Sequence, residues 1–364
     1  MSTVPSTHPS VDPSTTSSTA ASAASTASAT APPPAERGWL LPVGVALALA
    51  ALPFVVSPYQ QDLVLKVLIY AIFALSLELL VGTTGLVSLG HAAFLGIGAY
   101  VAALGSPPGA GASVLWLLPL AMLCAALYAL FVGALSLRTK GVYFIMVTLA
   151  FAQMAFFVFH DTRIGGGSDG IYLNVKPVLG TLLDLDKRTH FYYFVLGALV
   201  CTYALLALLL RSRFGHALAG IRTNEQRMRA VGFRTYPYKL AAFVIAGALA
   251  GLAGFLLAVK DGVVNPDLLS WHESGAVLLM LILGGLGHLR GAVIGAVAFT
   301  LLKELYSSQA IVGPLADHWQ LTFGFTIIAF VAWLPKGLMG LTLRRKPVAA
   351  LASGVVDKDG DADD

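Results

Sequence analysis

Runs of about 20 mainly apolar residues recur along most of this sequence. A helix of about 20 residues is long enough to cross the ~30 Å hydrocarbon core of a lipid bilayer. Charged residues make up only 12% of the chain, against about 25% in ordinary soluble domains, so they are too few to cover a water-facing surface. The repeated runs therefore predict an all-α, polytopic transmembrane helical bundle, and they exclude a soluble enzyme.

Ten apolar runs are candidate membrane segments. They span roughly 39–57, 63–81, 86–104, 114–136, 142–159, 191–210, 238–259, 274–288, 290–306 and 319–335. Short loops rich in Lys and Arg stay in the cytoplasm, and with ten segments sixteen of the 23 basic residues fall on one side. We therefore expect about ten segments with both termini cytoplasmic. The runs at 274–288 and 290–306 are short, so they are also candidates for a re-entrant pair.

Composition divides the chain into three parts. Residues 1–36 are rich in Ser, Thr, Ala and Pro and contain no Lys or Arg, which predicts a disordered tail. Residues 37–346 form the predicted membrane domain, with an external loop at 160–190 and a basic cytoplasmic loop at 211–237. Residues 347–364 end in aspartates and form a second predicted disordered tail.

The chain lacks the short motifs of common catalytic and metal sites. It contains no HExxH sequence, no Cys/His metal cluster, and no Gly-Lys dipeptide of the kind that a phosphate-binding P-loop requires. We therefore expect no catalytic residue, metal or cofactor in this chain, and any ATP to be bound and hydrolysed by another subunit. The net charge of +4 follows from membrane topology and does not predict nucleic-acid binding.

The cytoplasmic loop has the pattern of a short amphipathic helix. Side chains recur at spacings of three and four residues, which places them on one helical face: Phe214, Leu218, Ile221, Glu225, Met228 and Val231. We expect one or two helices here, which either bind anionic lipid headgroups or dock on a cytoplasmic protein. Glu225 favours a protein partner, because contact with lipid alone would disfavour a carboxylate on that face.

Ionisable residues within the apolar runs are candidates for function, since charge is costly in a membrane. Glu78 and His91 are the deepest, and they flank a glycine-containing break. They pair, cap the break, or line a translocation pathway; the pathway candidates are Glu78, Ser88, His91 and Gly96. Other ionisable residues lie nearer to the external ends, where we expect their side chains to reach the interface: Lys66, Lys260, His272 and Glu273.

Two kinds of glycine pattern stand out. Small residues four apart allow close helix packing, which predicts packing positions at Gly247, Gly251, Gly287, Gly291 and Gly295. The external loop contains a glycine-rich segment made of Gly166, Gly167, Ser168, Asp169 and Gly170. Glycine permits positive φ and close backbone approach, so this segment is either a tight turn or a contact for the substrate or for a delivery protein.

Four sequence motifs resemble the permease subunits of branched-chain amino-acid ABC importers, of the LivM type. They are SLGHAAFLGIGAY at 88–100, GGSDG at 166–170, GHALAGIRTNE…AVG at 215–232 and WHESGAVLLMLILGGLGHLRGAVIGA at 271–296. The resemblance covers about residues 60–340. It implies a helical permease of the bacterial cytoplasmic (inner) membrane that acts with a second homologous permease, two cytoplasmic ATP-binding subunits and an external solute-binding protein.

In the family that it resembles, the cytoplasmic loop couples the permease to the ATPase. Carried over by position, the coupling residues are Gly215, Ala217, Ile221, Arg222, Asn224, Glu225 and Gly232. The chain departs from the family pattern at His216, at Ala219-Gly220 and at Arg227-Met228, so the details of docking differ. The implied cargo is a branched-chain amino acid or a related amino-acid-like or amide solute.

An ion-gradient-driven secondary transporter is the alternative function. It would need carboxylates within the membrane as ion sites, and Glu78 and Glu304 are the two that qualify. A membrane-embedded enzyme is a weaker alternative, because the sequence contains no catalytic cluster. The sequence does not identify the solute.

Overall fold

The computed structural model describes residues 40–54, 56–106, 112–173, 177, 187–308, 313, 318–334 and 337–343. Both predicted tails, 1–36 and 347–364, lie outside the described residues. The chain divides into two compact units, Met1–Leu47 and Ala48–Asp364. The packing and the sites described below belong to the second unit.

Each of the ten predicted apolar runs contains a helix. The helices are α1 (Leu40–Ala51), α2 (Pro58–Glu78), α3 (His91–Leu104), α4 (Val114–Ser136), α5 (Val142–Asp161), α6 (Arg188–Arg211), α9 (Thr235–Asp261), α10 (Trp271–Gly284), α11 (Leu289–Ser307) and α13 (Trp319–Trp333). The all-α class is therefore confirmed. Six helical segments are long and apolar enough to cross a membrane, or seven if the bent pair α10–α11 counts as one, within the described part of the chain. Ten full crossings are not confirmed, because α1 and α3 are short and a break bends α10 against α11.

The remaining elements are short and connect the long helices. They are η1 (Leu52–Phe54), η2 (Leu79–Thr84), η3 (Arg163–Gly165), η4 (Gly167–Asp169), β1 (Ile171–Tyr172), α7 (Arg213–Thr223), α8 (Glu225–Ala230), β2 (Val263–Val264), η5 (Pro266–Leu269) and α14 (Gly337–Leu343). Of these, η2 is a π-helical continuation of α2. Strands β1 and β2 pair antiparallel over two residues, with Ile171 opposite Val264.

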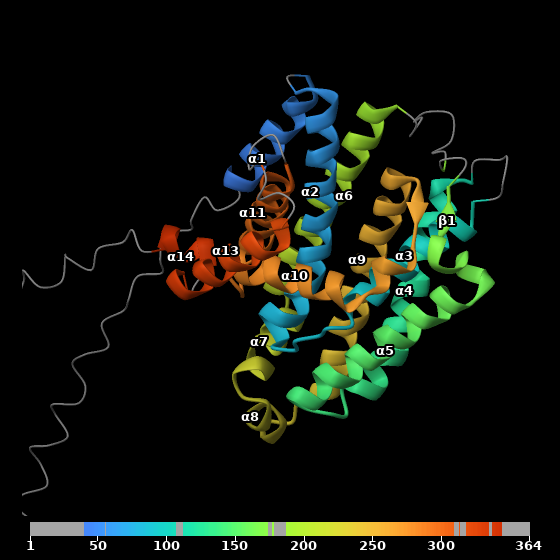
Figure 1. Cartoon of the computed structure of the whole chain (residues 1–364). Coiled ribbons are helices and arrows are strands. Elements are labelled where there is room, and N and C mark those ends of the chain that lie inside the picture. Colours follow the sequence, from blue (N-terminus) through green and yellow to red (C-terminus); the bar gives the residue numbers. More distant parts are fainter. Residues whose placement is uncertain are drawn as a thin grey trace, which may run out of the picture. The chain divides into compact units, whose positions relative to one another are not determined.

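Helices α2 and α9 form the centre of the bundle. Helix α9 packs against α2, α3 and α4, and α2 packs against α6, α9 and α11. In contrast, α4, α5 and α6 each leave apolar side chains exposed. Examples are Leu123, Met154 and Leu208. A helix that is apolar all round is buried, whereas exposed apolar faces are expected where lipid is the solvent. Figure 1 shows α8 at the lower end of the view, with α7 just above it.

Glycines allow the central helices to approach each other closely. A Cβ on Gly254 of α9 would lie 1.8 Å from the Leu95 carbonyl oxygen of α3. On the α4 side, Gly247 and Gly251 lie against Ala129 and Ala125, where added Cβ atoms would be 2.4 and 2.5 Å from the alanine Cβ atoms. Small residues thus hold α9 close to both α3 and α4.

Candidate functional site

Helices α10 and α11 are bent by 115° at the break between Gly284 and Leu289. Gly285 and Gly287 have φ values of +108° and +89°, a region that side-chain-bearing residues rarely adopt. Gly291 and Gly295 lie against the α10 backbone, where added Cβ atoms would be 2.4 Å from the Gly285 carbonyl oxygen and 1.9 Å from that of Met280. Gly287 does not share this packing role that its spacing predicted, because it forms the turn itself.

The bent pair runs along α2 and then turns back. The Tyr70 hydroxyl donates a hydrogen bond to Glu273, near the start of α10, over 3.3 Å. The break follows farther along α2, where the Gly287 N–H donates to Glu78 Oε1 over 2.7 Å. Near the end of α11, Glu304 accepts a hydrogen bond from Tyr59, at the start of α2. The pair thus forms a hairpin beside α2, not a single interrupted crossing.

Glu78 caps the break from within the bundle. Its side chain is 1% exposed, and its Oε2 atom has no hydrogen-bond partner among the described residues. Gly82, one turn later, leaves room for it, since a Cβ there would lie 1.8 Å from Glu78 Oε1. A carboxylate that accepts a backbone N–H in a buried site stabilises the segment that donates it. Of the roles weighed for Glu78, the structure shows this capping contact.

Arg222, in the predicted cytoplasmic loop, reaches the break between α10 and α11. Its guanidinium donates a hydrogen bond to the Gly82 carbonyl oxygen in η2. A Cβ on Gly287 would lie 3.6 Å from Arg222 Nη1, and one on Gly85 would lie 3.4 Å from Arg222 Cγ. The end of α2, the α10–α11 break and helix α7 therefore meet around one arginine side chain.

The predicted cytoplasmic loop forms two helices with different exposure. Helix α7 begins after Ser212 and buries Gly215, Ala217, Leu218 and Ile221 against the bundle. Asn224 then breaks the helix in an extended conformation, and its side chain accepts a hydrogen bond from the Arg227 N–H over 2.9 Å. Helix α8 has no buried residue, and Gly232 follows it with φ +96°. Two helices are within the expectation of one or two, and Asn224 divides the face that the spacing predicted.

Glu225 is held by this chain's own residues. Its carboxylate lies 2.5 Å from Arg229 Nη2 and 2.7 Å from Lys239 Nζ, and it accepts a hydrogen bond from Thr235 Oγ1 over 3.0 Å. Burial alone would raise the pKa of Glu225, but the hydrogen bonds from Lys239, Thr235 and Arg229 outweigh it and lower the pKa from its ordinary 4.5 to about 2. This carboxylate therefore attaches α8 to the first turns of α9.

The other predicted pathway residues lie in the packed interior. His91 is fully buried, its Nε2 lies 2.8 Å from Ser76 Oγ, and its ring contacts those of Phe73 and Phe94. Ser88 accepts a hydrogen bond from the Gly90 N–H over 3.3 Å. Gly96 lies against Leu269, where a Cβ would be 2.3 Å from Leu269 Cγ. The structure does not bring these three residues or Glu78 to the cavity described below.

The glycine-rich segment of the predicted external loop folds into a compact turn. Gly166, Gly167 and Gly170 all have positive φ, between +68° and +76°. Gly170 lies so close to β2 that a Cβ would be 2.2 Å from the Val264 carbonyl oxygen. Ser168 and Asp169 remain exposed. The turn is therefore attached to the segment that leads into α10, and its polar side chains face outward.

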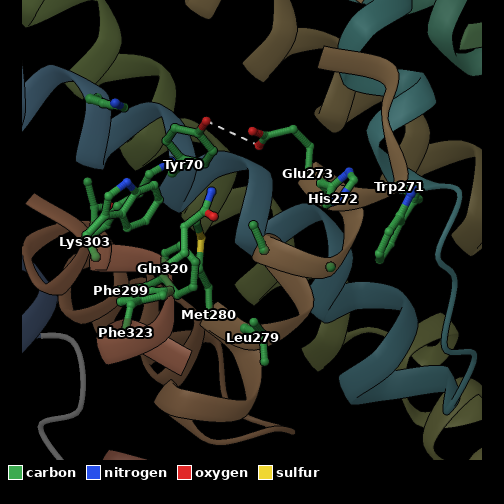
Figure 2. Close-up of a pocket in the computed structure, with 15 residues that line it drawn as sticks. Tyr70, Trp271, His272, Glu273, Leu279, Met280, Phe299, Lys303, Gln320 and Phe323 are labelled. Atoms are coloured by element: carbon green, nitrogen blue, oxygen red, sulfur yellow. Dashed lines mark hydrogen bonds between the residues drawn. The ribbon is translucent and has the colours of Figure 1, made fainter. Parts of the chain in front are cut away.

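A cavity of about 360 Å³ lies between α2, α10, α11 and α13. Two lysines and one glutamate line it, namely Lys66, Lys303 and Glu273. In Figure 2, the Tyr70 hydroxyl faces the Glu273 carboxylate, and apolar side chains including Met280 gather below them. The cavity thus combines both signs of charge with an apolar lining.

The comparisons with known proteins agree with this architecture. The family model described as "Branched-chain amino acid transport system / permease component" matches residues 61–332. The chain belongs to this permease family. The resemblance found in the sequence is thereby confirmed, and the chain is an integral membrane permease component.

Curated relatives include two kinds of permease. This permease is 32% identical to the high-affinity branched-chain amino acid transport system permease protein LivM of Salmonella typhimurium (strain LT2), over 84% of this chain and 75% of that protein. It is 31% identical to LivM of Escherichia coli (strain K12), over 86% and 76% of the two chains. The permease protein LivH of Salmonella typhimurium is 23% identical, over 74% and 91%. No solved structure matches the chain.

Sequence reasoning did not find the cavity of the permease. Lys66 and Glu273 were expected to reach the membrane interface, but Lys66 lies eight residues after Pro58, or about 12 Å along the helix axis. Charged residues at such depth usually face a bundle interior or a water-filled cavity, and this was the signal that could have identified them. Their grouping with Lys303 depends on the hairpin between α10 and α11, which no local motif encodes.

Acidification is expected to release α8 from α9 in this permease. Because the pKa of Glu225 is lower in the folded chain than in the unfolded chain, the stabilisation is fully present above about pH 4.5 and is lost as the pH falls toward about 2. Hydrogen exchange of the α8 amides, corrected for intrinsic rates, should stay constant from about pH 7 to about pH 5 and rise below that. Glu225→Gln should remove this dependence, and equal pH profiles for both proteins would contradict the assignment.

Proposed function

We propose that this permease is one membrane subunit of an ATP-driven importer that carries branched-chain amino acids, or a related amino-acid-like solute, across the bacterial cytoplasmic membrane. The observation that carries this proposal is the family match over residues 61–332, together with two relatives named as branched-chain amino acid permeases. Because the sequence contains no Gly-Lys dipeptide for a P-loop, ATP would be bound and hydrolysed by two cytoplasmic partner subunits.

A second permease subunit completes the proposed membrane pathway. The chain is similar to proteins named LivM and to proteins named LivH, which supports a partnership between two related permeases. An external solute-binding protein would deliver the cargo. The exposed Ser168 and Asp169 of the external turn offer this protein a polar contact that is connected, through β1 and β2, to the segment entering α10.

The α7–α8 end of the bundle is proposed to face the cytoplasm. Basic residues concentrate there, in α7, in α8 and in the nearby α4–α5 turn with Arg138 and Lys140, as expected for cytoplasmic loops. The hairpin α10–α11 counts as two membrane segments that return to the same side, which gives ten segments in all. An even number of segments puts both termini on the same side of the membrane. With the α7–α8 end in the cytoplasm, that side is the cytoplasmic one.

Helix α8 and the residues after it are the proposed docking surface for an ATP-binding subunit. Val231 is 71% exposed and Phe233 is 40% exposed, beside the charged side chains of α8. Exposed apolar groups rimmed by polar residues are typical of protein interaction sites. Lipid headgroups would contact the basic side chains of the same loop.

Reconstitution tests the proposed function. The permease would be purified with its partner subunits and placed in proteoliposomes, and uptake of radiolabelled L-leucine in the presence of the solute-binding protein would be measured. Uptake should require ATP on the cytoplasmic side and should survive an uncoupler. Uptake that persists without ATP and collapses with the uncoupler would instead establish the ion-gradient-driven alternative.

A further inference from the structure

We propose that the cavity between α2, α10, α11 and α13 binds the amino-acid cargo, with Lys66 and Lys303 toward the carboxylate and Glu273 toward the ammonium group. The inference rests on the proposed function, because it assigns a binding site to the cargo of the importer. It adds a location and a set of recognition groups that differ from the residues around Glu78 and His91.

The charged groups of the cavity attract one another across it, but among the described residues they form no close ion pair. Lys66 forms no hydrogen bond or ion pair with any described residue. Lys303 lies over the Trp319 ring, with Nζ 5.6 Å from the ring centroid. The carboxylate of Glu273 accepts a hydrogen bond from Tyr70 over 3.3 Å and forms no ion pair within the described part of the chain. Both signs of charge are thus left available to a ligand.

Lys260 provides a contrast to the cavity lysines, because it is held in ion pairs. Lys260, at the end of α9, forms ion pairs with Asp62 over 3.1 Å and with Asp261 over 2.8 Å. Charges within membrane proteins usually pair with one another or line a functional path. Lys260 follows the first pattern, and the cavity lysines follow the second.

The rest of the cavity matches a small solute with an apolar side chain. Its volume of about 360 Å³ is near the lower end of the ~300–1,000 Å³ range of ligand pockets. Leu279, Met280, Phe299 and Phe323 line it alongside the charged groups, and Figure 2 shows these four side chains gathered on one side. A branched-chain amino acid carries an ammonium group, a carboxylate and a compact apolar group within this size.

The cavity also lies at a depth that suits a transport site. Tyr70 is the thirteenth residue of the 27-residue helical segment Pro58–Thr84, so the cavity is near the middle of the membrane segment that forms one wall. Transport sites are commonly found near the bilayer midplane, where discontinuous helices leave room for a solute. Helix α10, whose first turn contains the Glu273 that Tyr70 contacts and which breaks at Gly285, is such a helix.

Ligand analogues separate the roles of the charged groups. The assembled importer, without its solute-binding protein, would be placed in lipid nanodiscs, and equilibrium binding would be measured for L-leucine, L-leucinamide and 4-methylpentanoate. The amide lacks the carboxylate, and the acid lacks the ammonium group. Wild type should bind leucine about tenfold or more tightly than either analogue, the loss expected when a charged hydrogen bond is removed.

Variants assign each group to its residue. Glu273→Gln should weaken leucine binding about tenfold or more and leave 4-methylpentanoate binding unchanged, whereas Lys66→Met and Lys303→Met should weaken both acids and leave leucinamide unchanged. Glu304→Gln is the matched control, because Glu304 contacts Tyr59 and does not line the cavity; its binding should equal that of wild type. Assembly of each variant would be checked by size-exclusion chromatography, with Glu273→Asp as the substitute where Glu273→Gln does not assemble.

Two results would overturn the cavity assignment without affecting the proposed function. One is equal binding of leucine by wild type and by assembled Glu273→Gln and Lys66→Met. The other is a loss that is the same for leucine and for both analogues, which would indicate a structural effect. The proposed function fails in a different way, through absence of ATP-dependent leucine uptake by the wild-type importer.

Discussion

Replacing Gly254 with alanine is expected to destabilise the permease by about 3 kcal/mol or more. The added Cβ would lie 1.8 Å from the Leu95 carbonyl oxygen and 3.1 Å from the Ala99 nitrogen, both of them backbone atoms of α3. Backbone in a packed helix cannot move aside as a flexible side chain can, so α3 and α9 would have to separate. Since α9 is at the centre of the bundle, the separation would disturb packing on several sides.

Gly197→Ala provides the matched control for this prediction. Gly197 lies inside α6, and nothing lies within 4 Å of the position of its Cβ. Alanine there should be neutral or stabilise by up to about 1 kcal/mol, since glycine is the poorer helix former. Thermal unfolding of the two detergent-solubilised variants would be followed by loss of the monodisperse chromatographic peak. Equal midpoints for the two variants would show that α3 and α9 are not in close contact at Gly254.

Arg222→Met is expected to uncouple the importer, lowering ATP-driven leucine uptake at least about tenfold. Methionine keeps much of the side-chain length but removes the guanidinium that donates to the Gly82 carbonyl oxygen. Helix α7 would still bury Leu218 and Ile221 against the bundle, so the loop should remain folded. The measurement is uptake by proteoliposomes, together with the amount of ATP-binding subunit that co-purifies with the permease.

Co-purification of the ATP-binding subunit should distinguish the role of Arg222 from that of the proposed docking surface on α8. Co-purification should be unchanged in Arg222→Met, because Arg222 acts within this chain. It should fall in Val231→Asp, which places a charge on the proposed docking surface, and it should be unaffected by Tyr172→Asp, an equally exposed position on β1. Wild-type uptake in Arg222→Met, or loss of the ATP-binding subunit from it, would contradict the expectation that the hydrogen bond from Arg222 to Gly82 serves coupling and not docking.

Helices and family were accessible from the sequence, because their signals are local. Each apolar run contains a helix, and the four motifs correspond to the family that the comparisons show. The four-residue spacing of Gly247 and Gly251 indicated packing positions, and the structure places both against alanines of α4. These features depend on hydropathy and on small residues at a fixed spacing. The transport and coupling roles of individual residues stay predictions.

Tertiary features were not accessible in the same way. Gly287 has the spacing of a packing glycine, but its positive φ and its bond to Glu78 make it part of a turn. Glu225 was expected to indicate a partner, yet Lys239 and Arg229 neutralise it within the chain. The cavity combines charges that are far apart in the sequence, so its composition becomes visible only after α10 and α11 fold back along α2.

Helix α2 contributes residues both to the cavity and to the contacts at the α10–α11 break. Thermodynamic linkage between these two sites follows from that. Lys66 and Tyr70 line the cavity, while Glu78 and Gly82, farther along the same helix, hold the break and Arg222. If an ATP-binding subunit changes the affinity for the amino acid by some factor through α2, the amino acid must change the affinity for that subunit by the same factor. A binding assay on one side of the membrane therefore reports the energy of coupling to the other.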